Sequence, residues 1–285
     1  MLARLLQRNA IPTTVFELDK DRHARTQGGS LDLHEGSAQR ALKEAGLYED
    51  FLKHARPEGE TLRIYDPYDK ALLDESKDAS EGRPEEMHGR PEIDRVLLRN
   101  MLLDSLERDS VRWGHKLIRV ERHADDESHE LIFDKHDTEK FDLVVGADGT
   151  WSRVRPLVTD AIPAFSGITG IDVHITNPEV RRPKLAERVG KGMCLTLGPD
   201  KGILCQRNGD GAIRVYALMR DAASWHKDCG IDWNDAEAAK STFASRYFGN
   251  WSQTAKNLIV ESDSDVVPRP IYMLPIGLRW QHRPG

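Results

Sequence analysis

Small and charged residues follow an apolar run near the middle of the chain. Residues 143–145 are aliphatic, as in a strand that is buried on both faces of a parallel sheet. Asp148 and Gly149 come next, and glycine lets a backbone turn sharply and approach a ligand closely. Ser152 then opens a predicted short helix, whose free N–H groups could face an anion. Nucleotides bind at such strand ends in open α/β sheets, but the spacing fits an ordinary strand-to-helix turn equally well.

An acidic residue ends the first predicted strand. Residues 2–8 carry leucines at helical spacing, and residues 13–17 read as a short β-branched strand that ends at Glu17. This order is typical of the second half of a βαβ nucleotide-binding unit, in which the acid binds a ribose and a glycine-rich loop lies about 20 residues upstream. No glycine precedes Gly28. We therefore expect the chain to begin inside the first helix of such a unit, without that loop.

Two further segments carry charge. Residues 21–34, with the pair Gly28-Gly29, read as an irregular loop, for which a solvated connector is the simplest interpretation. Residues 91–106 have the strongest helical pattern of the chain, and Arg95 and Arg99 share one face of that helix because they are four residues apart. Spacing alone favours a solvated, structural role for these two arginines.

Taken in order, these segments resemble the aromatic-ring flavoprotein monooxygenases, the para-hydroxybenzoate hydroxylase class. Asp148-Gly149-x-x-Ser152-x-x-Arg155 is similar to the second nucleotide-contact motif of that class. A set of residues nearer the N-terminus resembles the tetracycline-inactivating branch of that class. The set consists of Glu17, Arg25 and Gly28-Gly29-x-Leu31-Asp32-Leu33-His34. Arg-x-x-Leu-Arg, at residues 95–99, occupies the point where the family has an arginine against the flavin.

The resemblance implies a role for each of these residues. It makes Arg25 a contact of the nicotinamide cofactor, and it makes Asp32 and Asp148-Gly149 contacts of FAD. Arg95, with Arg99 second, would lie against the flavin, since an always-charged guanidinium suits a pyrophosphate or a flavin oxygen. The implied cofactor-binding residues are thus Glu17, Arg25, Asp32, Arg95, Arg99, Asp148 and Gly149.

The pattern changes after Arg155. Short strands separated by Gly, Pro and Asp clusters predict an antiparallel sheet, and a helix capped by Asp232 or Asn234 is predicted to run to about Tyr247 with Ala238, Thr242 and Phe243 inward. The expected fold is α/β: a Rossmann-like FAD-binding domain over residues 1–158 and an antiparallel substrate-binding sheet domain over residues 159–285. We expect the first strand and the C-terminal Gly-Asp segment of that fold to be missing.

Composition limits the class of protein. The chain has 285 residues, of which 39% are hydrophobic and 31% charged, and its net charge of −6 gives no support to a nucleic-acid partner. No apolar run approaches the ~18 residues that a membrane span needs. Cys194, Cys205 and Cys229 have no short pairing, and no histidines have the spacing of zinc ligands. We expect a cytoplasmic monomer without a metal site.

The expected reaction is the hydroxylation of a small, ring-containing organic substrate by FAD, oxygen and NADPH or NADH. In such enzymes the cofactor supplies the hard chemistry, so no catalytic acid or base is predicted. Members of the tetracycline-inactivating branch carry a glutamine and a histidine on the substrate sheet where this chain has Asp172 and Arg214. The two substitutions argue against tetracycline as the substrate.

Two other interpretations stay open at this point. The chain could be a truncated, non-catalytic remnant with weak or no flavin binding, because backbone contacts with a phosphate are strong and the predicted glycine-rich loop is lacking. A dehydrogenase that uses only a nicotinamide cofactor would suit the βαβ order, but not the antiparallel segment after Arg155.

Overall fold

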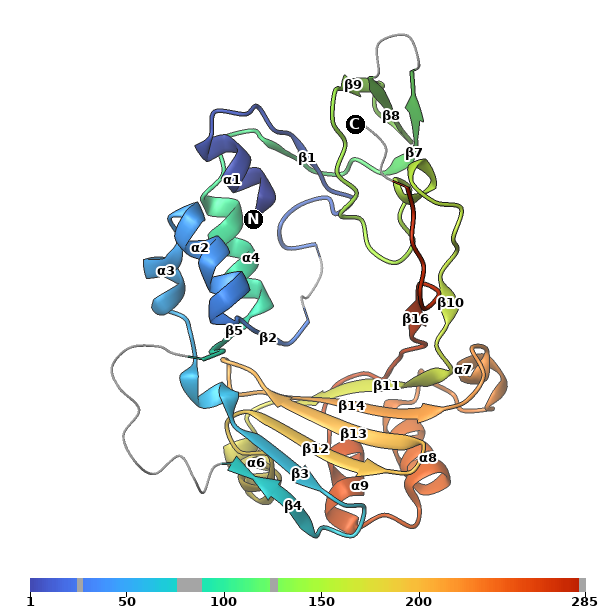
Figure 1. Ribbon diagram of the computed structural model, residues 1–285. Coiled ribbons are helices and arrows are strands. Elements are labelled where there is room, and N and C mark those ends of the chain that lie inside the picture. Colours follow the sequence, from blue (N-terminus) through green and yellow to red (C-terminus); the bar gives the residue numbers. More distant parts are fainter. Residues whose placement is uncertain (25–27, 76–88, 124–127, 282–285) are drawn as a thin grey trace. The chain divides into compact units, whose positions relative to one another are not determined.

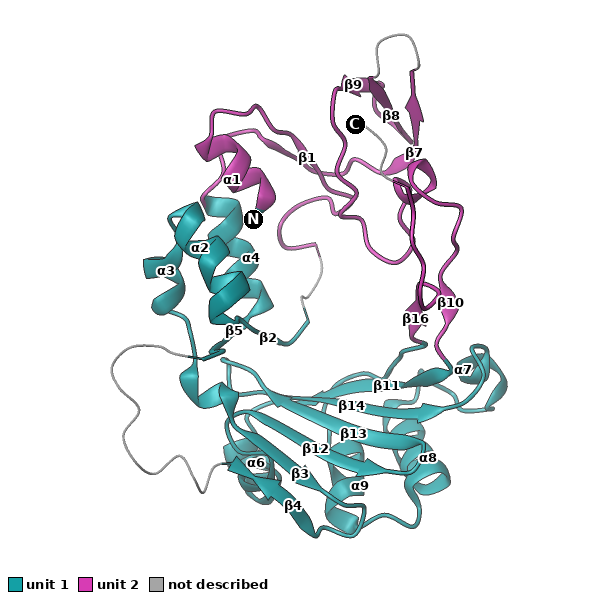
Figure 2. Cartoon of the chain, viewed as in Figure 1, with its two compact units in different colours: residues 1, 27–104, 167–270 teal, residues 2–26, 105–166, 271–285 magenta. Residues whose placement is uncertain are grey.

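The computed structural model describes residues 1–24, 28–75, 89–123 and 128–281. The chain packs into two compact units that are interleaved in sequence, and each is described by itself (Figure 2). Unit 1 holds residues 1, 27–104 and 167–270, and unit 2 holds residues 2–26, 105–166 and 271–285. The sequence predicts a different division, into an FAD-binding domain up to residue 158 and a substrate-binding domain after it. That functional division stays a prediction.

Unit 1 is built on a largely antiparallel sheet, as the sequence predicts beyond Arg155. In the described part of the chain this sheet has seven strands in the order β15-β11-β14-β13-β12-β3-β4, and only β12 and β3 are parallel neighbours. The strands are β3 (Leu62–Tyr65), β4 (Ala71–Asp74), β11 (Ile168–Ile175), β12 (Met193–Gly198), β13 (Lys201–Arg207), β14 (Ile213–Arg220) and β15 (Val267–Pro268). β3 and β4 form an antiparallel hairpin across residues 67–69.

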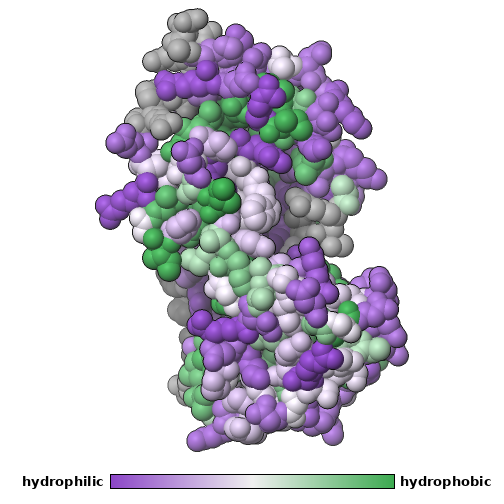
Figure 3. Space-filling view, turned by 90° about the vertical axis from the view of Figure 1, so that its right-hand side faces the viewer, coloured by the Kyte–Doolittle hydropathy of each residue, from purple (hydrophilic) through white to green (hydrophobic). Residues whose placement is uncertain are grey.

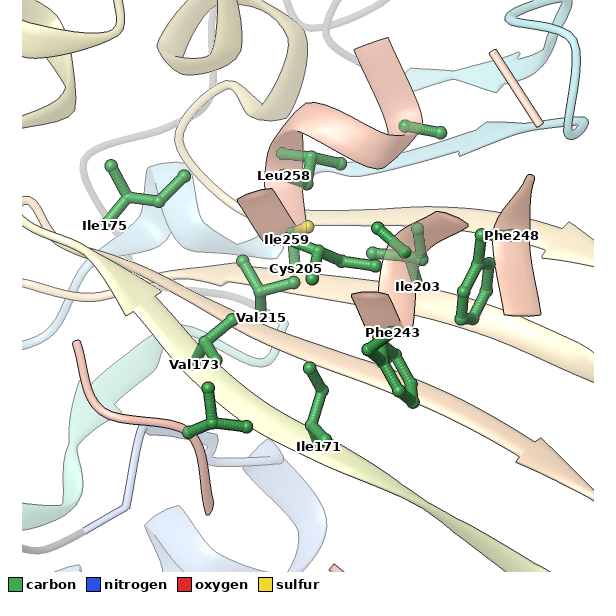
Figure 4. Close-up of a cluster of buried hydrophobic side chains, with 14 of the residues drawn as sticks. Ile171, Val173, Ile175, Ile203, Cys205, Val215, Phe243, Phe248, Leu258 and Ile259 are labelled. Carbon is green, nitrogen blue, oxygen red and sulfur yellow. The ribbon is translucent and has the colours of Figure 1, made fainter. Parts of the chain in front are cut away.

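Alternation along each strand separates the two faces of the sheet. In β14, Ile213, Val215 and Ala217 are fully buried, whereas Arg214 and Tyr216 lie on the other face. The buried face packs against helices, with α6, α8 and α9 on the same side of the sheet in Figure 1. Figure 4 shows side chains from the strands meeting Phe243, Phe248, Leu258 and Ile259 of the helices. The helices of this part are α5 (Pro178–Arg181), α6 (Pro183–Val189), α7 (Trp225–Asp228), α8 (Ala236–Phe248) and α9 (Gln253–Val260).

The start of α8 differs from the prediction. Its N-cap is Asp235, whose carboxylate accepts a hydrogen bond from the backbone N–H of Ala238 at 3.1 Å. Phe243 is buried as predicted, but Ala238 and Thr242 are exposed. Alanines lie on several faces of this helix, so its hydrophobic pattern does not define the buried face to within one residue.

The remaining part of unit 1 is a two-stranded ribbon with short helices. β2 (Ser30–Asp32) pairs with β5 (Glu92–Asp94) in antiparallel register, so that Asp32 lies opposite Glu92. The helices are a π-helical turn (Glu35–Gln39), α2 (Arg40–Ala45), α3 (Tyr48–Leu52), a 3-10 turn (Pro57–Glu60) and α4 (Arg95–Asp104). Gly46 caps the C-terminal end of α2 in the left-handed conformation, which favours glycine.

The ribbon corrects two predictions. The sequence predicts an irregular segment over residues 21–34, but residues 30–32 of it form β2. The helix expected to start at Pro91 begins instead at Arg95. Ile93 is completely buried as part of β5, so its burial belongs to the strand and not to the predicted helix.

Unit 2 contains the N-terminal helix and several small sheets. α1 (Leu2–Arg8) precedes β1, which pairs with β6 in parallel, and this pairing is the kind expected of a βαβ unit. β7, β8 and β9 form an antiparallel sheet, and β10 pairs with β16. The strands are β1 (Val15–Phe16), β6 (Val111–Arg112), β7 (Leu117–Arg122), β8 (His129–Phe133), β9 (Glu139–Phe141), β10 (Ala164–Phe165) and β16 (Tyr272–Met273), and a 3-10 turn spans Arg155–Leu157.

The buried strand predicted at residues 143–145 is wrong. Those residues belong to no strand in the described part of the chain. Leu143 and Val145 are 61% and 54% exposed. An apolar sequence favours a strand only where a neighbouring strand accepts its hydrogen bonds. Hydrophobic patches are visible at the molecular surface in Figure 3.

Among the described residues, no helix is both long enough and apolar enough to cross a membrane.

Candidate functional site

Arg56 fixes the β2–β5 ribbon within unit 1. Its Nη2 donates hydrogen bonds to the Oγ of Ser30 at 2.7 Å, to the Oε2 of Glu92 at 2.8 Å and to the backbone oxygen of Arg207 at 2.9 Å. The carboxylate of Asp94 lies 3.7 Å away and also accepts from the Ser30 hydroxyl and from the backbone N–H of Gly209. The ribbon is therefore joined to the end of β13 by one guanidinium and the acids around it.

Gln206 of β13 makes a second connection to the ribbon. Its Nε2 donates to the Oε1 of Glu92 at 3.1 Å and to the backbone oxygen of Ser30 at 3.3 Å, while its Oε1 accepts from the N–H of Ser30 at 3.2 Å. A Cβ atom at Gly29 would lie only 2.6 Å from that Oε1, so a larger residue at this position would require the Gln206 side chain to move. The sequence pair Gly28-Gly29 thus has a packing role beside the sheet.

Glu92 is buried, and burial raises the pKa of its carboxyl although Gln206 and Arg56 both favour the charged form. A pKa above the ordinary value of 4.5 means that the folded chain holds this proton more tightly than the unfolded chain does. The stabilising contribution of Glu92 is complete at pH values below its ordinary pKa of 4.5. It is lost as the pH rises through the raised pKa of the folded chain.

We therefore expect the stability of the unmodified chain, relative to the Glu92→Gln variant, to fall as the pH rises from below the ordinary glutamate pKa to neutrality. Urea denaturation of both proteins across that range measures the difference. A difference that stays constant or grows with pH would contradict the raised pKa.

The ribbon carries two of the predicted FAD contacts. The carboxylate of Asp32 is 3.3 Å from the Nη1 of Arg90 and keeps 29% of its side-chain surface exposed. Arg95 begins α4 directly after β5, and its backbone N–H donates to the oxygen of Gly29 at 3.2 Å. Its side chain is exposed and makes no hydrogen bond or ion pair with the residues that the structure describes. A Cβ on Gly28 would lie 3.2 Å from the Cδ of Arg95, so the glycine pair runs alongside this guanidinium.

The face of the sheet opposite its helices carries a charged cluster. Asp172 of β11 is 3% exposed and pairs with Arg214 of β14, at 2.6 Å, and with Arg269, at 2.8 Å. The Arg214 side chain lies over the ring of Tyr216, with 5.4 Å between the guanidinium carbon and the ring centroid. A Cβ on Gly29 would lie 3.6 Å from the Cδ of Arg214, so this cluster and the ribbon are close neighbours within unit 1.

Asp148 and Gly149 lie in a self-supporting turn of unit 2. The Oδ2 of Asp148 accepts from the backbone N–H of Arg153 at 2.7 Å, and Arg155 donates to the oxygens of Gly149 and Thr150 at 3.0 and 2.8 Å. Gly149 has a φ of +81°, which favours glycine, and no atom lies within 4 Å of where its Cβ would be. The turn leaves an open approach to its backbone.

Ser152 also acts within this turn. Its hydroxyl accepts hydrogen bonds from the N–H groups of Val154 and Arg155 at 3.1 and 3.0 Å. The sequence predicts that N–H groups of this segment are free to bind an anion. The following helix is only the 3-10 turn of Arg155–Leu157, so the first N–H groups are satisfied within the segment itself.

Glu17 follows β1 in unit 2, as predicted. Its Oε1 accepts from the backbone N–H of Asp19 at 3.1 Å, which orients the carboxylate. Its backbone pairs with Arg112 and His115. The second carboxylate oxygen makes no hydrogen bond within the described residues and is the atom that a ribose hydroxyl could reach.

The predicted residues thus fall in both units. Unit 1 brings together Asp32, Arg95 and, one turn along α4, the half-buried Arg99. Unit 2 holds Glu17 and the Asp148-Gly149 turn, and Arg25 lies outside the described residues.

Arg56 and Arg269 were not found from the sequence. Single arginines in irregular segments have no periodic signal. The alternation along the segment 213–218, by contrast, predicts from the sequence that Arg214 and Tyr216 share one face, as they do in β14.

These residues have the chemistry that FAD requires of its protein contacts. FAD carries a pyrophosphate and hydroxyl-bearing chains, which bind to guanidinium groups, to accessible backbone and to carboxylates that accept hydroxyl protons. The exposed guanidinium of Arg95, the open backbone at Gly149 and the carboxylates of Asp32 and Glu17 offer each of these.

Comparison with known proteins gives a consistent result. Residues 1–247 match the FAD binding domain family. The monooxygenase penA of Penicillium thymicola is 30% identical over 96% of this chain and 71% of its own length. A FAD-containing monooxygenase structure from Photorhabdus luminescens has a TM-score of 0.74 at 19% identity, covering 98% of this chain and 74% of the other. The structure of the tetracycline destructase Tet(55) has a TM-score of 0.66 at 18% identity, covering 96% and 66%.

The two structures show the fold alone, and it is the α/β fold with an antiparallel sheet that the sequence predicts. The chain spans about two thirds to three quarters of the length of these three proteins. The comparisons favour a flavin enzyme over a non-catalytic remnant or a dehydrogenase without flavin. With most of its length in the family match, the chain belongs to the FAD binding domain family of FAD-dependent monooxygenases.

Proposed function

We propose that the protein hydroxylates a small, ring-containing organic substrate, with electrons from NADPH or NADH and with molecular oxygen. The observation that supports this most directly is in unit 1. The Gly28-Gly29 segment runs between the side chains of Arg95 and Arg214, beside the strand that carries Asp32. A predicted flavin contact therefore lies next to the sheet to which the family resemblance assigns substrate binding.

The role of the protein is to hold the cofactor and to orient it toward the substrate. When bound, FAD supplies the transfer of electrons and the activation of oxygen. We assign Asp32, Arg95 and, second, Arg99 to FAD. Arg95 neutralises negative charge on the cofactor, and Asp32 accepts a hydrogen bond from it.

In unit 2 we assign Asp148 and Gly149 to FAD as well. Glu17 takes a ribose hydroxyl, and Arg25 meets the nicotinamide cofactor. The family resemblance and the chemistry of each side chain support these assignments.

The substrates and the cellular compartment of the protein form the second part of what we propose. The substrate is a small organic molecule and the second substrate is oxygen, with no nucleic-acid partner. Three cysteines remain as free thiols, two of them buried, which suits a reducing compartment. On this basis we propose a cytoplasmic location, and we propose separately that the protein is a monomer.

Anaerobic reduction followed by oxygen uptake tests the proposed function. The purified chain is mixed with FAD, and NADPH or NADH is added without oxygen. We expect the flavin absorbance to bleach, and we expect oxygen uptake once air is admitted.

Two results would contradict the proposal. A chain that leaves FAD oxidised with both nicotinamide cofactors would not be an FAD reductase. Oxidation of the nicotinamide cofactor without oxygen uptake would instead indicate a dehydrogenase.

A further inference from the structure

The β2–β5 ribbon of unit 1 is held along both of its outer edges. On the β5 side, the backbones of Arg56 and Glu92 exchange two hydrogen bonds, of 2.8 and 3.2 Å. On the other side, β2 has no strand partner besides β5 in the described part of the chain. The outer edge of β2 instead meets one side chain, that of Gln206 in β13.

The Gln206 amide takes the place of a strand partner. In an antiparallel ladder the N–H and C=O of one residue point to the same side, and a neighbouring strand satisfies both. The Oε1 of Gln206 accepts from the N–H of Ser30 at 3.2 Å, and its Nε2 donates to the oxygen of the same residue at 3.3 Å. A single side chain therefore satisfies both backbone groups at this point of β2.

The same amide also contacts the second strand of the ribbon. Its Nε2 donates to the Oε1 of Glu92 in β5, at 3.1 Å. Among side chains, only those of asparagine and glutamine combine an NH2 group with a carbonyl oxygen. A glutamate at position 206 would remove both donors and place a carboxylate against the oxygens of Ser30 and Glu92.

The sheet fixes where this amide lies. The backbone of Gln206 lies between Met193 of β12 and Arg214 of β14, its partners in the two ladders. Cys205, the preceding residue of β13, is buried in the core against the helices, so Gln206 points to the opposite face. Since β13 is an inner strand of the sheet, its side chains are a fixed reference for the ribbon.

We propose that Gln206 is a positioning residue for FAD, whose amide holds the outer edge of β2 and thereby fixes Asp32 and the start of α4 at Arg95. Asp32 lies two residues beyond Ser30 in β2. On the other side of Ser30, the oxygen of Gly29 accepts from the N–H of Arg95 at 3.2 Å. This inference rests on the proposed function, since it names a residue that holds the proposed FAD contacts in place.

A purely structural role makes a different prediction. If Gln206 only stabilised the fold of unit 1, its variants would unfold more easily, but the folded variants would bind FAD with unchanged affinity.

Amide hydrogen exchange of the purified chain without FAD tests the position of β2 directly. Gln206→Leu removes the amide and keeps an apolar side chain. We expect residues 28–34 to exchange at least about tenfold faster in this variant, as for the loss of one or two hydrogen bonds. Exchange in β11 and β14 should be unchanged, because their ladder does not involve the amide.

FAD titration of folded variants tests the effect on the cofactor. At about pH 8, where carboxyl groups are charged, we expect Gln206→Leu and Gln206→Glu to bind FAD at least about tenfold more weakly than the unmodified chain. Circular dichroism establishes that each variant is folded. Glutamate has nearly the shape of glutamine, so Gln206→Glu keeps the inference testable if Gln206→Leu does not fold.

The pH dependence of Gln206→Glu provides a rescue. Protonation of the introduced carboxyl returns an O–H donor, and a neighbouring carboxylate favours this neutral form. At about pH 5 we expect the FAD affinity of Gln206→Glu to be within about threefold of that of the unmodified chain, whereas Gln206→Leu stays about tenfold weaker. The charged groups around position 206 are Glu92 and Asp94 of β5, Asp32 of β2, Arg214 of β14, and Arg56.

Gln253→Glu is the matched control. Gln253 is an exposed residue of α9 whose Nε2 donates to the Oδ1 of Asn257. The same chemical change at this position should alter neither the FAD affinity nor the exchange of residues 28–34.

Unchanged exchange of residues 28–34 in Gln206→Leu would overturn the inference. So would an FAD affinity in both Gln206 variants equal to that of the unmodified chain, and this result would leave the proposed function intact. If the unmodified chain binds no FAD, the proposed function fails, and hydrogen exchange alone then decides whether Gln206 holds β2.

Discussion

Replacing Arg56 with methionine is expected to lower the free energy of unfolding by about 3–5 kcal/mol, because removing one member of a buried ion pair leaves the other charge without compensation. Glu92 has 1% of its side chain exposed and Arg56 has 15%, so water cannot replace the lost contact. Methionine keeps the apolar length of the side chain, which limits the change to charge and hydrogen bonds. Chemical denaturation of both proteins measures the difference.

The same substitution should also weaken FAD binding. Arg56 joins Ser30 and Glu92, one on each strand of the ribbon that carries Asp32 and leads into Arg95. Arg220→Met is the control, since the Arg220–Asp200 pair is exposed at both members and such pairs contribute little. A stability change in Arg56→Met no larger than that of the control would contradict the role given to Arg56.

Replacing Phe243 with alanine is expected to lower the free energy of unfolding by about 3–5 kcal/mol, the usual effect of removing a buried aromatic ring. Phe243 is completely buried, and its ring centroid lies 5.6 Å from that of Trp225, 5.2 Å from Tyr247 and 5.6 Å from Phe248. The cavity would lie between α8 and the sheet whose other face carries Arg214. Thermal and urea denaturation measure the loss.

Val180→Ala provides the comparison for Phe243→Ala. Val180 is an apolar residue in α5 that is 84% exposed, so its truncation should change stability little. If Phe243→Ala were no less stable than Val180→Ala, the helices would not be packed on the sheet as the structure has them.

The sequence predicts the sheet of unit 1 well because its strands obey a local rule. Alternate residues of β14 differ in polarity, and the two faces then follow from strand geometry. Residues 143–145 show where the same reasoning fails. Their aliphatic sequence indicates a strand, but a strand also needs a partner, and pairing is not a local property. The predicted helix starts at residue 91, before the true start of α4, for a related reason. In a short sequence, a residue that is buried in a strand, as Ile93 is in β5, looks the same as a residue that is buried on a helix.

The candidate site was only partly accessible from the sequence. Family resemblance supplied Asp32 and Arg95 because they lie in recognisable motifs. Arg56 and Arg269 come from segments without a motif, and their importance depends on acids that are distant in sequence, Glu92 and Asp172. Such long-range ion pairs are fixed by the fold and leave no spacing pattern.

Titration of the purified chain with FAD, followed by flavin fluorescence and absorbance, tests the central claim most directly. We expect saturation near one FAD per chain, and we expect Arg95→Gln to bind about tenfold more weakly, as for the loss of a charged hydrogen bond. Arg40→Gln, an exposed arginine of α2 outside the site, should bind FAD like the unmodified chain. No saturable FAD binding, or equal affinity in Arg95→Gln and the unmodified chain, would contradict the account.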